Sequence, residues 1–291
     1  MEKTAAIFVT YNHVPEWSVL KTVLFNLDYL VIIDNASESE VRKNISLFCQ
    51  KNLEKCLLIL KDRNVGISRA YNEAVDYLKP LGVHWIYFFD HDAIFTDELI
   101  VQTRKHFDEF VSKKFGLLVP IVSDRQSLLN AHLFNGSPLT VVHNAITSGM
   151  LTSIDVFQKV KGFDDDFFVE GADYAFSQRI AKAGFGIIRI NQVLIVQKFE
   201  EKPNGHRSLR RLFDRIIEFR SIIRVGIGNS NIFRTTVSYY NPTRGNELKT
   251  SLNLLKSKFP DDRRFIMIVS FLTFAERILV SALSRSSGTE R

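Results

Sequence analysis

The chain has 291 residues, of which 45% are hydrophobic, 24% charged and 12% aromatic, and its formal net charge at pH 7 is +6. This composition excludes a disordered or collagen-like chain, and the length is sufficient for one large hydrophobic core or two small ones. The two cysteines, Cys49 and Cys56, are too few for a disulfide framework, and the first residues contain no apolar segment typical of a secretory signal. We therefore expect a cytoplasmic protein with reduced thiols.

The first part of the chain alternates short apolar runs with helical patterns. The runs are rich in Ile, Val, Phe and Tyr without polar alternation, which is typical of strands covered on both faces. This order predicts an α/β domain with a mostly parallel sheet flanked by helices. We expect strands at 5–10, 30–34, 56–60 and 85–90, and helices at 16–26, 38–51, 67–79 and 97–111.

After about residue 115 the pattern changes twice. Shorter apolar runs come first, followed by a predicted helix and a final strand; these segments are 117–119, 128–133, 139–142, 173–183 and 187–196. Residues 201–291 look helical and contain 17 Lys and Arg against 8 Asp and Glu, whereas residues 1–200 contain 21 against 24. We predict a domain over residues 1–200 and a basic helical C-terminal extension over residues 201–291.

Polar residues follow the predicted strands where each one ends. In open α/β sheets ligands bind beyond the carboxyl ends of the strands. Asp90 and Asp92 suit a Mg²⁺ or Mn²⁺ ion, because both ions prefer hard oxygen ligands and two nearby carboxylates need a compensating charge. In extended geometry the two would point the same way, with His91 opposite. The alternative is that the aspartates cap the next turn.

Two earlier strand ends predict contacts to a nucleotide. Asp34 is placed to accept a hydrogen bond from a base N–H or a ribose hydroxyl, or else to form an Asx turn with Asn35. Gly66 stands at a tight turn before a helix, whose free N–H groups favour an anion, and Arg69 would help to hold a diphosphate. Alternatively, Gly66 only turns the chain. The P-loop pattern is absent.

Four ordered segments together resemble the family 2 glycosyltransferases, and the resemblance covers about residues 4–196. The segments are Val9-Thr10-Tyr11-Asn12, Ile33-Asp34-Asn35-Ala36-Ser37, Asn64 to Asn72, and Asp90-His91-Asp92. The resemblance implies an A-type nucleotide-sugar-binding fold, a nucleoside diphosphate sugar as donor, Mg²⁺ or Mn²⁺ as cofactor and inversion at the anomeric carbon.

The resemblance also assigns roles to residues at the strand ends. Thr10 and Asn12 would border the nucleotide, and Asp34 would contact the base. Asn64, Gly66 and Arg69 would lie under the base and phosphates. Asp90 and Asp92 match the metal motif, with Asp92 as the direct ligand.

The segment from Gly162 to Asp173, followed by Arg179, is similar to the acceptor side of this family. There an aspartate at the start of a helix removes the proton of the attacking hydroxyl, which makes Asp173 the predicted general base. Glu170 is a rival base, and an N-cap role for Asp173 is the structural alternative. The run Asp164-Asp165-Asp166 is expected to be a solvated turn.

Two further segments extend the resemblance. Ser148-Gly149-Met150-Leu151 would line the donor-sugar pocket, with Gly149 as the binding residue; without the resemblance it is an ordinary turn. Residues 239–246 are similar to a segment of bacterial rhamnosyltransferases in this family, where Arg244 would contact a diphosphate or an anionic acceptor. This similarity makes dTDP-rhamnose the leading donor and a lipid-linked or polysaccharide molecule the expected acceptor.

The C-terminal extension predicts how the protein meets its acceptor. The apolar run 265–283 is interrupted by Glu276 and Arg277 and is too short to span a bilayer. We expect a peripheral helix on anionic lipid at the inner face of the membrane, or equally packing against the domain or a second subunit in a homo-oligomer. No zinc-finger spacing or RNA-binding aromatic motif supports a nucleic-acid partner.

Two other functions remain open from the sequence. A nucleotidyltransferase that makes sugar nucleotides shares this plan, but it should have a Gly-rich phosphate loop near the first strand, which Thr10-Tyr11-Asn12-His13 does not provide. A catalytically silent sugar-nucleotide-binding protein is the other alternative. Its support is that Ala172 and Ala175 stand where acids often flank the base in the family.

Overall fold

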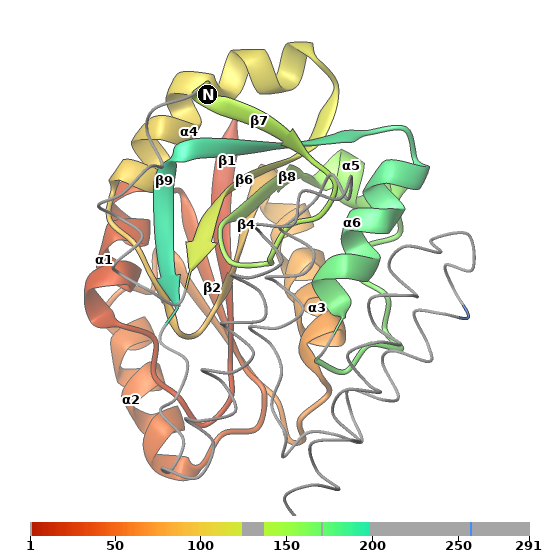
Figure 1. Cartoon of the computed structure of the whole chain (residues 1–291). Helices are drawn as coiled ribbons and strands as arrows, with labels where there is room; N and C mark the ends of the chain where they lie inside the picture. The colour runs from red at the N-terminus through yellow and green to blue at the C-terminus, as the bar shows by residue number, and fades with distance from the viewer. Residues whose placement is uncertain (1, 124–136, 170, 198–256, 258–291) are drawn as a thin grey trace, which may run out of the picture. The chain divides into compact units, whose positions relative to one another are not determined.

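The structure is a computed structural model that describes residues 2–123, 137–169, 171–197 and 257 (Figure 1). Nearly all of these belong to the first of two units into which the chain divides, Met1–Lys202. The strands are β1 Lys3–Thr10, β2 Tyr29–Asp34, β3 Cys56–Leu60, β4 Val83–Asp90, β5 Ala93–Ile94, β6 Phe115–Ser123, β7 Leu139–Val142, β8 Met150–Ser153 and β9 Gly186–Gln197. The helices are α1 Trp17–Asn26, α2 Ser39–Gln50, α3 Ile67–Leu78, the 3-10 turn η1 Lys79–Leu81, α4 Glu98–Ser112, α5 Ile154–Lys159 and α6 Ala172–Lys182.

The nine described strands form one mixed sheet in the order β3-β2-β1-β4-β8-β6-β9-β5, with β7 paired to β9. The four strands from β3 to β4 are parallel, as the sequence predicts. Beyond β4 the sheet is mixed: β8 runs antiparallel to both neighbours, while β6 and β9 are parallel. The predicted mostly parallel arrangement therefore holds in the first half of the domain only, although the α/β class is confirmed.

Helices cover both faces of the sheet, which explains the uniformly apolar strands. On one face, Phe8 and Phe89 stack with ring centroids 4.9 Å apart, within the core that includes buried residues of α1, α2 and α4. On the other face, Phe88 contacts Tyr71 of α3, Phe157 of α5 and Phe176 of α6. Figure 1 shows α1 and α2 on one side of the parallel strands and α3 on the other. This packing fixes the carboxyl ends of β1, β2 and β4 relative to one another.

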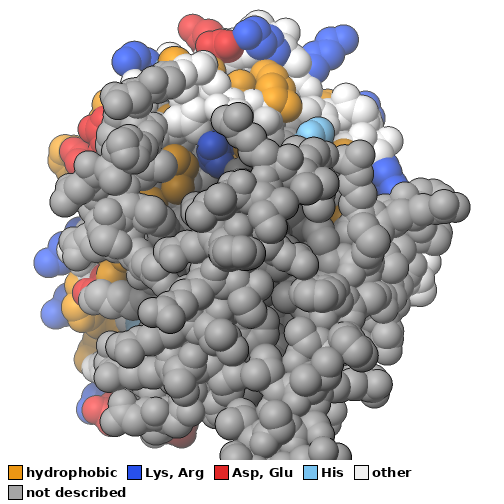
Figure 2. Space-filling model, viewed as in Figure 1, with side chains coloured by type: hydrophobic (Ala, Val, Ile, Leu, Met, Phe, Trp, Pro, Cys, Tyr) orange, Lys and Arg blue, Asp and Glu red, His pale blue; other side chains and the backbone are white. Residues whose placement is uncertain are grey.

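The two cysteines of the chain lie close together in the core of the described part. Cys49 in α2 and Cys56 in β3 are buried free thiols whose Sγ atoms lie 2.8 Å apart. On the described surface visible in Figure 2, basic side chains are interspersed with acidic and apolar ones. None of the helices in the described ranges is both long and apolar enough to cross a membrane. The run 265–283, the predicted run 128–133 and all of the basic extension except Ser257 lie outside the described residues.

Candidate active site

The carboxyl ends of three neighbouring strands bring the predicted site residues to one edge of the sheet. Thr10 at the end of β1 is paired with Asp34 at the end of β2, and Val9 is paired with Asp90 at the end of β4. These pairings place Asp34 and Asp90 on either side of β1. The structure therefore brings together Asp34, which the sequence predicts to contact the nucleobase, and Asp90, which it predicts to belong to the cation site.

Asp34 lies at this edge, at the end of β2, with a side chain that is fully buried. Its Oδ2 is 2.9 Å from Arg42 Nε and accepts a hydrogen bond from Ser37 N at 3.1 Å. Its Oδ1 is also buried and accepts no hydrogen bond from a described residue. A buried acceptor without a donor is costly, so Oδ1 is suited to an N–H or hydroxyl of a ligand.

The loop after β1 is tied to the loop after β2. Asn12 has a φ of 51°, its backbone N–H donates to Ser37 Oγ at 2.8 Å, and its Oδ1 accepts from Glu38 N at 2.8 Å. Thr10 donates its hydroxyl to the carbonyl of His13, and its own carbonyl accepts from Asn35 N at 2.8 Å. Both predicted nucleotide residues thus shape the rim around Asp34.

The loop after β3 is organised by two asparagines. Asn64 Oδ1 accepts from Asn35 Nδ2 at 2.7 Å and from Gly66 N at 3.0 Å, while Asn35 Oδ1 accepts from Val65 N at 2.9 Å. Asn35 was expected only as part of an Asx turn, but its side chain joins the loops after β2 and β3. The predicted residue Asn64 therefore acts within the protein as a loop-forming acceptor.

Gly66 is required by a close backbone approach. Its φ is 84°, and an added Cβ would lie 2.7 Å from the carbonyl oxygen of Phe168. The next residue, Ile67, donates its N–H to the same carbonyl at 2.6 Å. One of the first N–H groups of α3, predicted to face an anion, is therefore used to hold the segment that leads to α6.

Replacing Gly66 by alanine should lower the free energy of unfolding by about 2–3 kcal/mol, because both the positive φ and the contact with Phe168 oppose a side chain. Gly82→Ala is a matched control, since Gly82 has a φ of 70° and no atom within 4 Å of an added Cβ. It should cost only about 1 kcal/mol. Urea unfolding of both variants checks the difference; equal losses would contradict the steric explanation.

Asp90 is surrounded by donors. Ser148 Oγ lies 2.7 Å and Gln197 Nε2 2.8 Å from its Oδ2, and Tyr71 Oη lies 3.2 Å from its Oδ1. Burial raises the pKa of Asp90 above its ordinary value, and these three hydrogen bonds oppose the rise. Both oxygens of Asp90 are thus engaged by the protein.

Asp92 lies in a turn between β4 and β5, not in the extended geometry that the sequence suggests. Even so, Gln197 Nε2 approaches Asp92 Oδ1 at 3.5 Å as well as Asp90, so the two carboxylates share one donor. The ring of His91 stacks on that of His13, with centroids 4.6 Å apart. Among the described residues no group of three or more His, Cys, Asp or Glu side chains is arranged as a metal site.

Asp173 stands in the first turn of α6, and Gly171, with a φ of 85°, holds the N-cap position. The N-cap alternative for Asp173 is therefore wrong. Its Oδ1 accepts from Tyr174 N at 2.7 Å. Burial, together with the negative charge of Asp90, raises the pKa of Asp173 to about 7. This value suits a group that must accept a proton near neutral pH. The rival base Glu170 lies outside the described residues.

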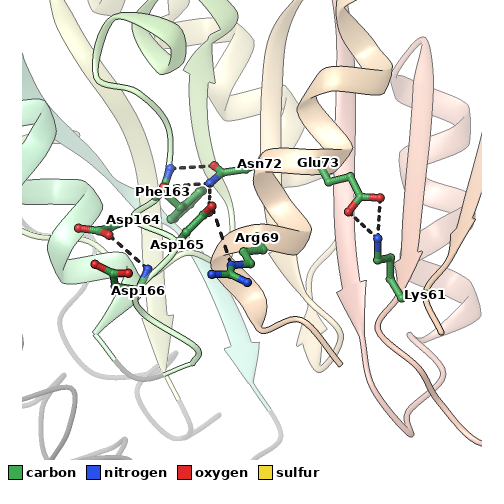
Figure 3. A network of polar contacts seen from close by, with 8 residues as sticks. All are labelled: Lys61, Arg69, Asn72, Glu73, Phe163, Asp164, Asp165 and Asp166. Atoms are coloured by element: carbon green, nitrogen blue, oxygen red, sulfur yellow. Dashed lines mark hydrogen bonds and ion pairs between the residues drawn. The ribbon is translucent and has the colours of Figure 1, made fainter. Parts of the chain in front are cut away.

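The segment before α6 is docked on α3 (Figure 3). Asn72 donates to the Phe163 carbonyl at 2.9 Å and to Asp165 Oδ1 at 2.7 Å, and its own Oδ1 accepts from Phe163 N at 2.9 Å. Arg69 Nε lies 3.9 Å from Asp165 Oδ2, with both side chains about half exposed, so this pair contributes little to stability.

The prediction of a solvated turn is wrong for Asp164. Asp164 is only 6% exposed and pairs with Arg179, whose Nη2 lies 2.9 Å from its Oδ2. Arg179 Nη1 also donates to the carbonyls of Lys161 and Gly162, at 3.1 Å each. Arg179 thus anchors the turn from the side of α6, while Asp165 and Asp166 are exposed as expected.

Gly149 immediately precedes β8, a strand that the sequence did not predict. Its N–H donates to the Phe88 carbonyl at 2.8 Å, and an added Cβ would lie 2.5 Å from Ile195 Cδ1. The structure gives Gly149 a packing role next to Ser148, which contacts Asp90. Its predicted contact with the donor sugar remains a prediction, and Arg244 lies outside the described residues.

Three contributors to the site were missed in the sequence. Arg42 pairs with Asp34 from the first turn of α2, Ser148 was considered only for the sugar pocket, and Gln197 ends β9. Gln197 had a usable signal, since it comes one residue after the predicted strand 187–196 and so at the type of position where ligand-site residues are sought.

Comparison with known proteins supports the resemblance. Residues 7–112 match the model of Glycosyl transferase family 2, a range that includes Asp34, Asp90 and Asp92 but not Asp173. Over 212 residues the chain is 26% identical to the dTDP-rhamnosyl transferase RfbF of Shigella flexneri, which covers 68% of this chain and 69% of that protein. The predicted similarity to family 2 glycosyltransferases, and to a rhamnosyltransferase among them, is confirmed.

Solved structures confirm the A-type fold. GalNAc-T7 with UDP, GalNAc and Mn²⁺ superposes with a TM-score of 0.50 at 11% identity, covering 72% of this chain and 47% of that one. TarS of S. aureus gives a TM-score of 0.50 at 13% identity, covering 90% of this chain and 50% of that one. The chain thus spans about half the length of each of these two proteins.

Proposed function

We propose that the protein is an inverting glycosyltransferase that moves a sugar from a nucleoside diphosphate sugar to a hydroxyl of a lipid-linked or polysaccharide acceptor. The observation that carries this proposal is the placement of Asp173, with a pKa of about 7, within electrostatic reach of Asp90 at the edge that also holds Asp34. Asp173 would be the general base, Asp90 a carboxylate of the cation site and Asp34 the carboxylate that binds the nucleotide. Together they supply the groups that a single displacement uses.

Asp34 would recognise the nucleotide. Its Oδ1 is buried without a donor among the described residues, and a thymine or uracil ring offers an N–H and a ribose offers hydroxyls. Arg42 and Ser37 both engage Oδ2 and so keep the carboxylate oriented, with Oδ1 left for the ligand. The dTDP-rhamnosyl transferase RfbF supports dTDP-rhamnose as the donor.

A divalent cation fits the second part of the site. Asp90 and Asp92 supply hard oxygen atoms, and their shared donor Gln197 is neutral, so the pair retains net negative charge. Asp90 accepts hydrogen bonds from three donors, which suits it to orient the site. Asp92 would then be the direct ligand of the ion, as the family motif implies. Bound Mg²⁺ or Mn²⁺ would neutralise charge that develops on the departing diphosphate. The Mn²⁺ and UDP in GalNAc-T7 agree with this assignment.

Asp173 would take the proton of the acceptor hydroxyl as that oxygen attacks the anomeric carbon. Attack on the face opposite the diphosphate inverts the configuration in one step, and no covalent sugar–protein bond is needed. The segment before α6 is bonded to α3 through Asn72 and Phe163, which supports a defined position of the base relative to the nucleotide loops. This anchoring favours an active enzyme over a silent binding protein.

The setting of the protein belongs to the same proposal. Residues 1–200 would form the catalytic domain, and the basic residues 201–291 would contact an anionic acceptor or the inner face of the membrane, or a second subunit. The net charge of +9 in this extension supports anionic partners. We place the protein in the cytoplasm, peripheral to the membrane, with no nucleic-acid partner.

A thermal-shift panel of nucleoside diphosphate sugars with and without Mn²⁺ tests the donor and the cation together, since a ligand that binds the folded state raises the melting temperature. The expected result is stabilisation by dTDP-rhamnose with Mn²⁺, followed by release of dTDP when a lipid-linked or polysaccharide acceptor is added. Stabilisation without release for every acceptor tried would favour the silent binding protein.

Replacing Asp34 by asparagine should weaken donor binding about 10–100-fold, because the variant loses the charge that pairs with Arg42, and its amide oxygen would face Arg42 and Ser37 so that an NH₂ group replaces the acceptor offered to the ligand. The donor KM measures the effect, and kcat at saturation should fall less. Asp28→Asn is a control on the surface next to β2. Unchanged donor KM in Asp34→Asn would exclude Asp34 from nucleotide binding.

A further inference from the structure

Gln197, the last residue of β9, is the donor that joins the carboxylates of the site. Its Nε2 lies 2.8 Å from Asp90 Oδ2, 2.8 Å from Ser148 Oγ and 3.5 Å from Asp92 Oδ1, and the residue is only 3% exposed. β9 runs antiparallel to β5, where Gln197 is paired with Ala93, the residue after Asp92. The strand pairing therefore fixes the amide against both aspartates.

The neighbours determine the orientation of this amide. The contacts of 2.8 Å to Asp90 Oδ2 and Ser148 Oγ place the NH₂ group toward the carboxylates, because an amide N–H donates and these oxygens accept; the reversed amide would set Oε1 against acceptor oxygens. With the NH₂ group facing the aspartates, Oε1 is buried and accepts no hydrogen bond from a described residue. A buried acceptor that lacks a donor is suited to a hydroxyl or water that arrives with a ligand. The NH₂ group of Gln197 thus binds the carboxylates, and Oε1 is left to accept a hydrogen bond from a ligand bound beside them.

We propose that Gln197 is a positioning residue for the divalent cation, because it holds Asp90 and Asp92 side by side and fixes Asp90 so that Asp92 meets the ion. This inference rests on the proposed function in so far as that function uses a cation. Two carboxylates at one site repel each other, and the N–H dipoles of the amide reduce the repulsion. A lysine or arginine here would add a full positive charge that competes with the ion, whereas glutamine leaves the net negative charge in place.

The test uses Gln197→Glu, which keeps the shape of the side chain and replaces the donor with a third carboxylate. Melting temperatures of the full chain are measured at pH 8 in EDTA and across a Mn²⁺ titration, without nucleotide. The variant should melt below the wild type in EDTA, gain more from Mn²⁺, and reach half of its gain at a Mn²⁺ concentration about fivefold or more lower. Gln192→Glu, on the same strand and partly buried, is the matched control and should leave the Mn²⁺ midpoint unchanged.

A second variant guards against misfolding of the first. Gln197→Asn remains a neutral amide but is one methylene shorter, so it loses its reach to Asp90, and the Mn²⁺ midpoint should rise about 10-fold. If both Gln197 variants change the melting temperature in EDTA but keep the wild-type Mn²⁺ midpoint, Gln197 only packs and the inference is wrong. Absence of any Mn²⁺ response in wild type and variants overturns it as well. Shifted midpoints in a protein that turns over no nucleoside diphosphate sugar would sink the proposed function and leave this inference standing.

Discussion

Replacing Asp92 by asparagine is expected to reduce sugar transfer about 10³-fold. The change removes the carboxylate proposed to bind the cation directly, and with it the charge that stabilises the departing diphosphate in the transition state. The side chain keeps its size, and Asp92 lies in the turn after β4 outside the hydrophobic core, so the melting temperature in EDTA should change by only a few degrees. Initial rates of nucleoside diphosphate release over a Mn²⁺ series measure the loss.

Asp108→Asn provides the comparison for this variant, because Asp108 is an exposed aspartate on α4. It should retain wild-type rates and the wild-type Mn²⁺ dependence. Near-normal turnover in Asp92→Asn would refute the metal role of Asp92. A loss of turnover that high Mn²⁺ restores would instead show that Asp92 contributes to affinity for the ion and is not essential for the chemical step.

Asp173→Asn is expected to reduce kcat about 10²–10⁴-fold, since asparagine cannot accept the proton of the acceptor hydroxyl. In the wild type, kcat/KM should rise with pH through about 7, the pKa of Asp173, because the base acts only when ionised. The variant should lose this limb of the pH profile. Glu170→Gln should retain both the rate and the limb; the opposite outcome for the two variants would make Glu170 the base.

The same substitution should stabilise the fold above neutral pH. The pKa of Asp173 rises from 3.8 to about 7 on folding, so the folded state favours the protonated carboxyl. The stability that this provides is complete below about pH 4 and is lost as pH rises through about 7. An asparagine side chain cannot ionise, so Asp173→Asn at pH 8 should unfold with a free energy about 1–2 kcal/mol higher than wild type. Urea unfolding at pH 5 and pH 8 measures both; a stability gain that is equal at the two pH values would contradict the explanation.

The first half of the fold was predictable because its signals are local. Each strand from β1 to β4 is a continuous apolar run, each helix between them is amphipathic, and the predicted bounds agree with the structure within two residues. The sequence does not predict β5, which has only two residues, or β8, whose first residues look like an ordinary turn and which is defined by its pairing with β4 and β6. The mixed character of the sheet follows from these long-range pairings, and the residues of a single segment do not indicate it.

The site divides in the same way. Asp34 and Asp90 end strands, so the general rule about ligand positions in α/β sheets finds them, and the family motifs point to Asp173. Their partners come from far along the chain: Gln197 is 107 residues from Asp90, and Ser148 is 58 residues from it. Such contacts depend on the strand order β4-β8-β6-β9, which one sequence does not provide. Residue types predicted the chemistry, and only the packing shows which groups tune it.

The contact of Phe168 with the start of α3 makes the two halves of the site mechanically dependent. The Phe168 carbonyl accepts from Ile67 N, and Asn72 bonds to the backbone of Phe163, so the loop proposed to lie under the donor is joined to the segment that leads to the proposed general base. A donor with a larger nucleobase or sugar that displaces residues 64–67 would therefore also shift the proposed general base, Asp173, away from the acceptor hydroxyl. A change of donor specificity therefore requires substitutions both in the nucleotide loops and in the segment that packs on α3. Exchange of the nucleotide loops alone should yield proteins that bind the new donor but transfer its sugar poorly.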